Sequence, residues 1–364
     1  MRKLANILVT GGAGFIGVNF IRFLLGEGAG KPDFNGRLVN LDALTYAGNA
    51  ASLREIEEKF GGGRYFFEKG DICDRPFVEK IFQKYSIDTV VHFAAETHVD
   101  RSILDPEAFI KTNVLGTCTL LDAARGAWKE KQDLLFHHIS TDEVYGSLGE
   151  TGFFTESTAY DPRSPYSASK AAGDHLVMAY HHTYGLPITL SNCANNYGPY
   201  QFPEKLIPLM ILNMLEGKPL PVYGDGKNIR DWVYVEDHNN AVWTIMQKGK
   251  AGEKYNIGGE NEWENIKLLN ELIDIVAAKT TTDAQARAAA IRSTITYVKD
   301  RPGHDRRYAI DCSKIKHELG WKQTVNFRQG LERTVDWYLA NTAWINSIRS
   351  GEYKGWIEKN YGGR

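Results

Sequence analysis

Short apolar runs alternate with stretches of helical periodicity along the first half of the 364-residue chain. Uninterrupted apolar runs predict buried strands, and apolar residues at every third or fourth position predict helices. The runs place strands at Leu4–Thr10, Arg37–Asp42, Arg64–Gly70, Asp88–Ala95, Leu134–Ser140 and Pro187–Asn192. The helical stretches between them include Phe15–Leu25, Pro106–Trp128 and 162–184. Strands alternating with helices predict an α/β fold with a Rossmann-type doubly wound parallel sheet.

The pattern changes after residue 195, where prolines and glycines become frequent and the elements shorten. We therefore expect a first domain over 1–195 and a smaller mixed α/β C-terminal domain over 196–230 and 258–364. Within 231–257, the apolar segments Trp232–Val235 and Glu253–Ile257 are expected to return to the first sheet. The alanine-rich stretch from Asp283 to Ala290 predicts an exposed helix or an ordered loop.

Composition excludes several classes of protein. Hydrophobic residues make up 43% of the chain and charged residues 24%, as in ordinary globular proteins. The net charge of −2 gives no electrostatic reason to expect nucleic acid or a membrane surface as partner. A strand at the start leaves no room for a signal peptide. The four cysteines form no Cys-x-x-Cys pair and fit reduced thiols, so we expect a cytoplasmic protein.

A glycine-rich turn joins the first strand to the first helix. Gly11, Gly14 and Gly17 allow the backbone to approach a pyrophosphate, which the helix N-terminus attracts. Asp42 ends the second strand at about the spacing expected for a carboxylate that binds the ribose 2′-hydroxyl. The same carboxylate would repel a 2′-phosphate. The turn and Asp42 therefore predict NAD rather than NADP as the cofactor.

Other residues at the strand ends extend this predicted cofactor site. Asp71 and Ile72 are placed to cap the adenine, although Asp71 is equally plausible as a helix N-cap. Small side chains at Ala94 and Ala95 leave room for a ligand against the fourth strand. Further contacts to the dinucleotide are expected from Phe15, Ile16, Ala43, Leu44 and Thr45.

Tyr166 and Lys170 are the candidate catalytic pair. Residues four apart share one face of a helix, and a cation beside a phenol lowers its pKa, so the pair predicts a base for a sugar hydroxyl. This spacing alone is weak evidence for a catalytic pair, because it also occurs by chance on surface helices. Thr141, Asp142 and Glu143 follow the fifth strand, and ligands bind outside the carboxyl ends of such strands. The alternative, acids at a helix N-terminus, does not explain their coincidence with a hydroxyl and Tyr166.

The two adjacent carboxylates indicate an elimination. Loss of water needs a base at one carbon and an acid at the next, and repulsion between neighbouring carboxylates favours different protonation states. A basic loop over 300–307, together with Arg230, is a candidate diphosphate site, although a charged surface loop is the usual interpretation. His137 and His138 are adjacent on a strand and point to opposite faces, so they predict no metal site.

Together these segments resemble the extended short-chain dehydrogenase/reductase family, and within it the nucleotide-sugar 4,6-dehydratases, over nearly the whole length. The most specific segments are Thr141–Glu143 and the loop Asp300–His304. The segment 147–156 is shorter than in many family members and borders the expected site. The resemblance rests on Thr10–Gly17, Asp42–Asn49, Ala94–Ser102, Ser140–Gly146, Tyr166–Lys170, Asn192–Tyr200, Ile229–Trp232 and Asp300–His304.

The resemblance implies the conversion of dTDP-D-glucose to its 4-keto-6-deoxy product. Tyr166 would take the proton of the 4-hydroxyl, Glu143 would remove the C5 hydrogen, and protonated Asp142 would release the 6-hydroxyl as water. Thr141 would bind the 4-oxygen. Lys170 would bind the nicotinamide ribose and hold the phenolate. NAD would take the C4 hydride and return it to C6, staying bound throughout.

The resemblance also assigns contacts and partners. It adds Phe93, Thr97, Thr112 and Asn196 to the NAD site, with Tyr166 and Lys170. It implies a homodimer, for which the helices around 105–128 and 162–184 are candidates. Its substrate contacts are Thr97, Thr141, Asn195, Lys205, Leu206, Pro221, Val222, Tyr223, Arg230, Asn265, Asp300, Arg301, Pro302, Gly303 and His304. A nucleotide-sugar 4-epimerase, a 4,6-dehydratase for another nucleotide sugar and a non-catalytic NAD-binding scaffold remain as alternatives.

Overall fold

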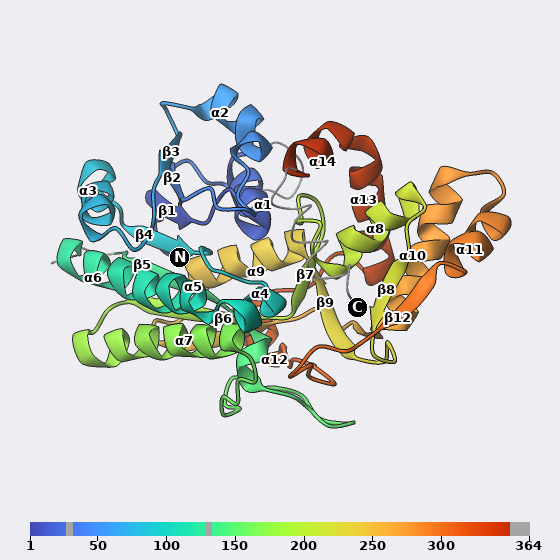
Figure 1. Ribbon diagram of the computed structural model, residues 1–364. Helices are drawn as coiled ribbons and strands as arrows, with labels where there is room; N and C mark the ends of the chain where they lie inside the picture. The colour runs from blue at the N-terminus through green and yellow to red at the C-terminus, as the bar shows by residue number, and fades with distance from the viewer. Residues whose placement is uncertain (27–31, 129–132, 350–364) are drawn as a thin grey trace.

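The computed structural model describes residues 1–26, 32–128 and 133–349. Its larger part is a seven-stranded sheet in which all strands run parallel, in the order β10-β6-β5-β4-β1-β2-β3 (Figure 1). The chain runs outward from central β1 through β3, then crosses back to build the other half from β4. This order confirms the predicted Rossmann-type sheet. The strands are β1 Asn6–Thr10, β2 Arg37–Asp42, β3 Tyr65–Lys69, β4 Thr89–His92, β5 Leu135–Thr141, β6 Ile188–Cys193 and β10 Glu253–Ile257.

Helices cover both faces of this sheet because the strands are apolar on both sides. Leu8 and Phe136 pack into one hydrophobic cluster, whereas Ile7 and Leu135 pack into another. On one face pack α3 Arg75–Tyr85, α6 Thr117–Ala127 and α7 Pro165–Tyr184; on the other pack α1 Phe15–Leu25, α9 Val235–Lys248 and α12 Ser313–Leu319. Shorter elements are η1 Ala50–Leu53, α2 Arg54–Phe60, α4 Val99–Leu104 and η3 Asp142–Tyr145.

The predicted helix Pro106–Trp128 is not regular. It consists of α5 Pro106–Ile110, a π-helical segment Lys111–Gly116 and α6 in succession. Single π-turns frequently occur at functional sites. Here the segment places Asn113 so that its Oδ1 accepts from the Glu96 N–H at 2.9 Å and its Nδ2 donates to Ser169 Oγ at 2.8 Å. The irregularity therefore joins the end of β4 to α7.

The smaller part of the molecule, on the right in Figure 1, has its own hydrophobic cluster, which includes Leu212, Leu272 and Leu331. It contains a three-stranded sheet of β11 Glu262–Glu264, β9 Ile229–Tyr234 and β7 Asn195–Tyr197, and a pair formed by β8 Leu220–Tyr223 and β12 Ile295–Val298. Its helices are α8 Leu206–Glu216, α10 Asn265–Thr280, α11 Ala284–Arg292, α13 Phe327–Ala340 and α14 Thr342–Ile348. The alanine-rich stretch thus forms a helix.

The two apolar segments expected to rejoin the first sheet behave differently. Glu253–Ile257 does so as β10, parallel to β6. The expectation for Trp232–Val235 is wrong, because β9 pairs with β7 and β11 instead. The edge of the first sheet beside β6 is taken by β10, and on β9 the Asp231 carboxylate accepts from the Gly259 N–H at 3.0 Å and the Asn261 N–H at 2.7 Å, which holds the chain before β11 next to β9.

The C-terminal part of the chain also returns to the larger part. Tyr308, Ile310 and Ile315 of the segment 308–321 are buried in the same cluster as Ile7 of β1. The cofactor-side core is therefore completed by residues close to the C-terminus. Residues 350–364 of the expected second domain lie outside the described residues. None of the helices in the described ranges is long and apolar enough to cross a membrane.

Candidate active site

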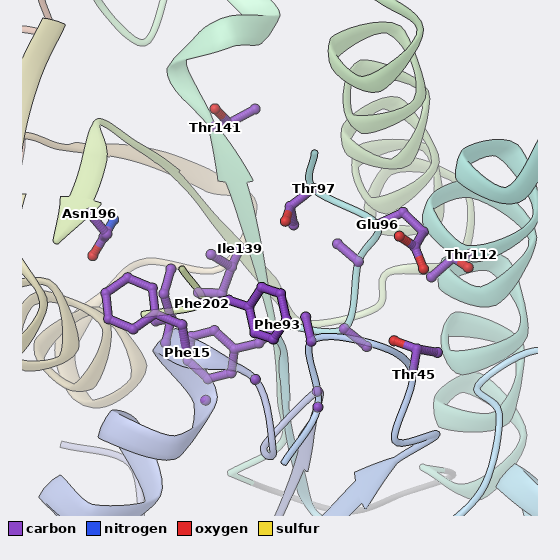
Figure 2. Close-up of a pocket in the computed structure, with 18 of the residues that line it drawn as sticks. Phe15, Thr45, Phe93, Glu96, Thr97, Thr112, Ile139, Thr141, Asn196 and Phe202 are labelled. Atoms are coloured by element: carbon purple, nitrogen blue, oxygen red, sulfur yellow. The ribbon is translucent and has the colours of Figure 1, made fainter. Parts of the chain in front are cut away.

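A cavity of about 340 Å³ lies at the carboxyl ends of β1, β2, β4, β5 and β6. In Figure 2, Phe15 and Phe202 lie together on one side of it, and Glu96 and Thr112 on the other. All five predicted catalytic residues line the cavity. So do all predicted cofactor contacts except Leu44, namely Gly11, Gly14, Phe15, Ile16, Gly17, Asp42, Ala43, Thr45, Asp71, Ile72, Phe93, Ala94, Ala95, Thr97, Thr112, Tyr166, Lys170 and Asn196.

The glycine turn brings the start of α1 directly to this cavity. Gly11 has a left-handed φ of 70°, and a Cβ there would lie 2.6 Å from the Ala94 nitrogen. A Cβ on Gly17 would lie 2.3 Å from the Gly11 carbonyl oxygen, so only glycine permits this approach of helix and strand. Gly14 is the N-cap and offers no side chain to the first N–H groups of the helix. The turn therefore fits a pyrophosphate.

Asp42 is held at the cavity by backbone hydrogen bonds. Its Oδ1 accepts from the Leu44 N–H at 2.7 Å and its Oδ2 from the Ala13 N–H at 2.9 Å. Burial raises its pKa, and these two hydrogen bonds oppose that rise. Leu44, which is in a left-handed conformation with φ 54°, contributes this N–H and does not line the cavity. The fixed carboxylate suits the two ribose hydroxyls of NAD.

Tyr166 and Lys170 both lie buried in the first turns of α7. Ser164 fixes this helix end through a capping box with Ser167. The Lys170 Nζ donates to the main-chain carbonyl of Ile139 in β5 at 2.7 Å. The ammonium is therefore held by the strand as well as by its own helix.

The expected lowering of the Tyr166 pKa is not found in this environment. Burial raises the pKa well above its usual value, and Glu143 and Cys193 add to the effect, whereas a hydrogen bond with Thr141 opposes it. Burial is the main cause, and the Lys170 ammonium donates to the Ile139 carbonyl. The phenol is thus the stable form here, and a bound cationic ring would favour its ionisation.

Asp142 and Glu143 differ in their electrostatic surroundings. They begin η3, where Thr141 is the N-cap and its Oγ1 accepts from the Glu143 N–H at 3.3 Å. Burial raises the pKa of Asp142 well above its usual value, and Glu143 and Asp231 raise it further. Burial also raises the pKa of Glu143, but Arg301, Arg230 and Lys205 oppose that rise. Burial therefore favours the protonated form of Asp142, whereas three cations favour the ionised form of Glu143.

The cations that act on Glu143 come from the smaller part of the molecule. Arg230 is buried on β9, donates to the Asp305 carbonyl at 2.9 Å and stacks 4.1 Å from the Tyr308 ring centre. Arg301 lies 3.6 Å from Asp100. Arg230 and the loop residue Arg301 therefore lie close enough to Glu143 to favour its ionised form.

The rest of that loop is held in shape by its own contacts. His304 Nδ1 lies 2.6 Å from Asp300 Oδ1, and burial lowers the His304 pKa to about 4, so this imidazole is neutral near pH 7. The Tyr223 hydroxyl donates to Asp100 Oδ2 at 3.1 Å and its ring meets His304 edge-on. These contacts link β8 to the loop.

The predicted substrate residues divide into two sets. Thr97, Thr141, Asn195 and Lys205 line the cavity, and Lys205 Nζ donates to the Thr97 carbonyl at 2.9 Å. The other set lies outside its lining and keeps its role as a prediction: Leu206, Pro221, Val222, Tyr223, Arg230, Asn265, Asp300, Arg301, Pro302, Gly303 and His304.

Several of the residues that line the cavity were not predicted from the sequence. Glu204 is the most informative, because its Oε1 accepts from the Tyr46 hydroxyl at 3.0 Å and its Oε2 lies 3.3 Å from Arg101. In the sequence, only its position next to the predicted substrate residue Lys205 pointed to Glu204. The others adjoin predicted residues at strand ends and turns: Leu41, Ala47, Gly48, Gly70, Glu96, Ile139, Ser140, Cys193, Ala194, Gln201 and Phe202.

Residues 8–334 match the GDP-mannose 4,6 dehydratase family. The chain belongs to this family. A dTDP-glucose 4,6-dehydratase from Salmonella typhimurium is 53% identical to it, with 99% of each chain covered. DesIV from Streptomyces venezuelae, a dTDP-glucose 4,6-dehydratase solved with NAD and dTDP bound, superposes with a TM-score of 0.85 at 45% identity, covering 94% of this chain and 99% of DesIV.

The family fold also serves other chemistry. A UDP-glucose 4-epimerase from Thermotoga maritima superposes with a TM-score of 0.79 at 28% identity, covering 93% of this chain and 99% of the epimerase. The fold is therefore shared by the two reaction types, and the choice between them depends on the side chains in the cavity.

Proposed function

We propose that this chain is an NAD-dependent dTDP-glucose 4,6-dehydratase, a hydro-lyase that forms dTDP-4-keto-6-deoxy-D-glucose. The observation that carries the proposal is the pair Asp142 and Glu143, which line one cavity with Tyr166 and differ in their electrostatic surroundings. The high identity to dTDP-glucose 4,6-dehydratases supports the thymidine nucleotide.

The residues then divide the reaction between them. Tyr166 accepts the proton of the 4-hydroxyl, with Thr141 holding the 4-oxygen and Lys170 the ribose. Oxidation at C4 makes the C5 hydrogen acidic, and Glu143 removes it while Asp142 gives its proton to the departing 6-hydroxyl. Glu143 returns a proton to C5 at the end. When bound, NAD supplies the hydride acceptor at C4 and the hydride donor at C6.

The residues around the cavity fit that cofactor. The turn with Gly11 and Gly17 admits a pyrophosphate, and Asp42 faces the ribose position. Asn196 Oδ1 is buried and has no hydrogen-bond partner among the described residues, so it is available to an amide donor. The substrate diphosphate would be bound by Arg230 and Arg301, which act on Glu143.

The competing activities predict different products in one experiment. Purified protein is incubated with dTDP-glucose in heavy water without added cofactor, and the sugar is analysed by mass spectrometry and NMR. We expect a 4-keto-6-deoxy sugar with deuterium at C5. An epimerase would give dTDP-galactose without solvent label, a scaffold would leave the sugar unchanged, and either outcome would overturn the proposal. Parallel incubations with UDP-glucose and GDP-mannose test for another nucleotide.

We further propose a homodimer that forms through the helices around 105–128 and 162–184. Leu104, Ile110 and Leu115 are exposed apolar residues within 99–116. Exposed leucine and isoleucine side chains favour burial against a partner. A second copy of the chain is the expected partner, as in the family resemblance.

Replacing Leu115 with Glu is expected to convert the dimer to a monomer, because a carboxylate would be buried at the interface. Analytical ultracentrifugation measures the mass. Tyr297→Glu is the matched control, since Tyr297 on β12 is equally exposed, 58% against 57% for Leu115. A monomeric parent protein, or no loss of mass in Leu115→Glu, would contradict this interface.

We also propose that the protein acts in the cytoplasm on a small nucleotide sugar, without a nucleic-acid or membrane partner. Cys73, Cys118, Cys193 and Cys312 are all free thiols, the form expected in reducing compartments.

A further inference from the structure

Asp174 is a buried carboxylate that no step of the proposed reaction uses. Its side chain is only 1% exposed. Its Oδ2 accepts from Ser140 Oγ and from the Tyr160 hydroxyl, both at 2.8 Å, and lies 3.4 Å from Asn192 Nδ2. Burying a charge is costly unless it is hydrogen-bonded or paired, so three donors directed at one oxygen indicate a site built to hold this group.

These hydrogen bonds connect the two halves of the catalytic set. Asp174 lies four residues after Lys170 on α7, so both side chains project from the same face of the helix. Lys170 donates to the carbonyl of Ile139, and Asp174 accepts from the side chain of Ser140, the next residue of β5. The turn with Asp142 and Glu143 starts two residues further on. These hydrogen bonds hold α7, which carries Tyr166, against β5, which directly precedes Asp142 and Glu143.

Asn192 adds a third connection to the same point. Its Nδ2 donates to the main-chain carbonyl of Thr141 at 3.1 Å, while it also reaches Asp174 Oδ2. Asp174 therefore contacts, directly or through one side chain, two consecutive residues that precede the acid pair. Loss of its bonding would release this end of β5 from α7.

The charge of Asp174 also acts on Lys170. Burial lowers the pKa of Lys170, and Asp174, followed by Cys193, opposes the fall. His138 Nε2 lies 3.3 Å from Asp174 Oδ1, but burial lowers the His138 pKa to about 4, so His138 adds no positive charge at neutral pH. The titratable groups that face this pair from neighbouring elements are His92, His138, Tyr145, Tyr160, Cys193 and Lys254.

We propose that Asp174 is a positioning residue that keeps α7 in register with the Thr141–Glu143 turn and provides the counter-charge of the Lys170 ammonium. It touches neither substrate nor cofactor and acts through Lys170 and Ser140. This inference rests on the proposed dehydratase reaction, in which Lys170 must be protonated.

The test compares Asp174→Asn with Tyr160→Phe. The first removes the charge and keeps the shape, and the second removes one hydrogen bond to the same oxygen and keeps the charge. Without the carboxylate the pKa of Lys170 falls further, so Lys170 loses its proton at a lower pH. We expect the alkaline limb of the kcat profile to move down by roughly one pH unit or more in Asp174→Asn and to stay in place in Tyr160→Phe. Thermal unfolding is measured for both.

The outcomes separate this inference from the proposed function. An unmodified enzyme that releases no 4-keto-6-deoxy sugar refutes the function itself. A normal parent enzyme with an unmoved alkaline limb in Asp174→Asn, or equal shifts in both variants, refutes the role of Asp174. If Asp174→Asn does not fold, Asp174→Glu replaces it: the retained charge should leave the limb in place while the longer side chain lowers kcat, and a limb moved down refutes the role.

Discussion

Tyr166→Phe is expected to lower kcat by roughly 10²–10⁴-fold, the usual contribution of general acid–base catalysis. The substitution removes only the phenol oxygen from a side chain that is 7% exposed and packs edge-on against Phe109. The ring, and with it the packing of α7, should stay. Because this oxygen takes the first proton, the loss should appear in the oxidation at C4, before any elimination.

Stopped-flow absorbance of reduced nicotinamide measures that first step. In Tyr166→Phe, the rate of reduction should fall as far as kcat does, while bound NAD and the unfolding temperature stay near those of the parent. Phe109→Leu is a suitable control, because it changes the same aromatic contact and leaves the oxygen in place. Rapid nicotinamide reduction in Tyr166→Phe would exclude this phenol as the base.

Glu143→Gln should block the elimination of water and leave the oxidation at C4 unaffected. Glutamine keeps the size and the backbone hydrogen bond to Thr141 but has no basic carboxylate, so removal of the C5 hydrogen should slow by roughly 10²–10⁴-fold. Oxidation at C4 does not need this base. The variant should therefore accumulate reduced nicotinamide and a 4-keto sugar that still carries its 6-hydroxyl.

Two measurements check this stall. NMR of the quenched reaction should show no deuterium at C5 in heavy water, and mass spectrometry should show no loss of water. Asp142→Asn serves as the paired variant, because loss of the acid should slow departure of the 6-hydroxyl while Glu143 still exchanges the C5 hydrogen. Normal product formation by Glu143→Gln would remove Glu143 from the mechanism.

The first sheet could be predicted because its strands are buried on both faces. Such strands are continuous apolar runs in the sequence, and for Arg37–Asp42 the predicted and observed bounds agree. Trp232–Val235 has the same apolar character, and the prediction failed because the pairing of β9 depends on residues far away in the sequence, such as Gly259 and Asn261, which donate to the adjacent Asp231 carboxylate. The hydrophobic periodicity of the sequence does not indicate hydrogen bonds of this kind.

The predicted catalytic residues line one cavity, and the sequence could indicate this because the carboxyl ends of parallel strands meet at one edge. The pKa shifts of these residues could not be predicted. The spacing of Tyr166 and Lys170 predicted a lowered phenol pKa, but a carbonyl of another strand holds the ammonium and burial raises that pKa. Likewise, only the fold brings Arg301 and Lys205 to Glu143, where they oppose the rise in its pKa, whereas Arg230 opposes the rise for both Glu143 and Asp142.

Residues 308–321 and β1 belong to one hydrophobic cluster, which has a consequence for biosynthesis. β1 is among the first parts of the chain to leave the ribosome, yet Tyr308, Ile310 and Ile315 of the same cluster are made near the end of translation. The nucleotide-binding half therefore cannot reach its final core while the chain is still short. We expect nascent chains that end before residue 308 to expose apolar surface and to depend on chaperones.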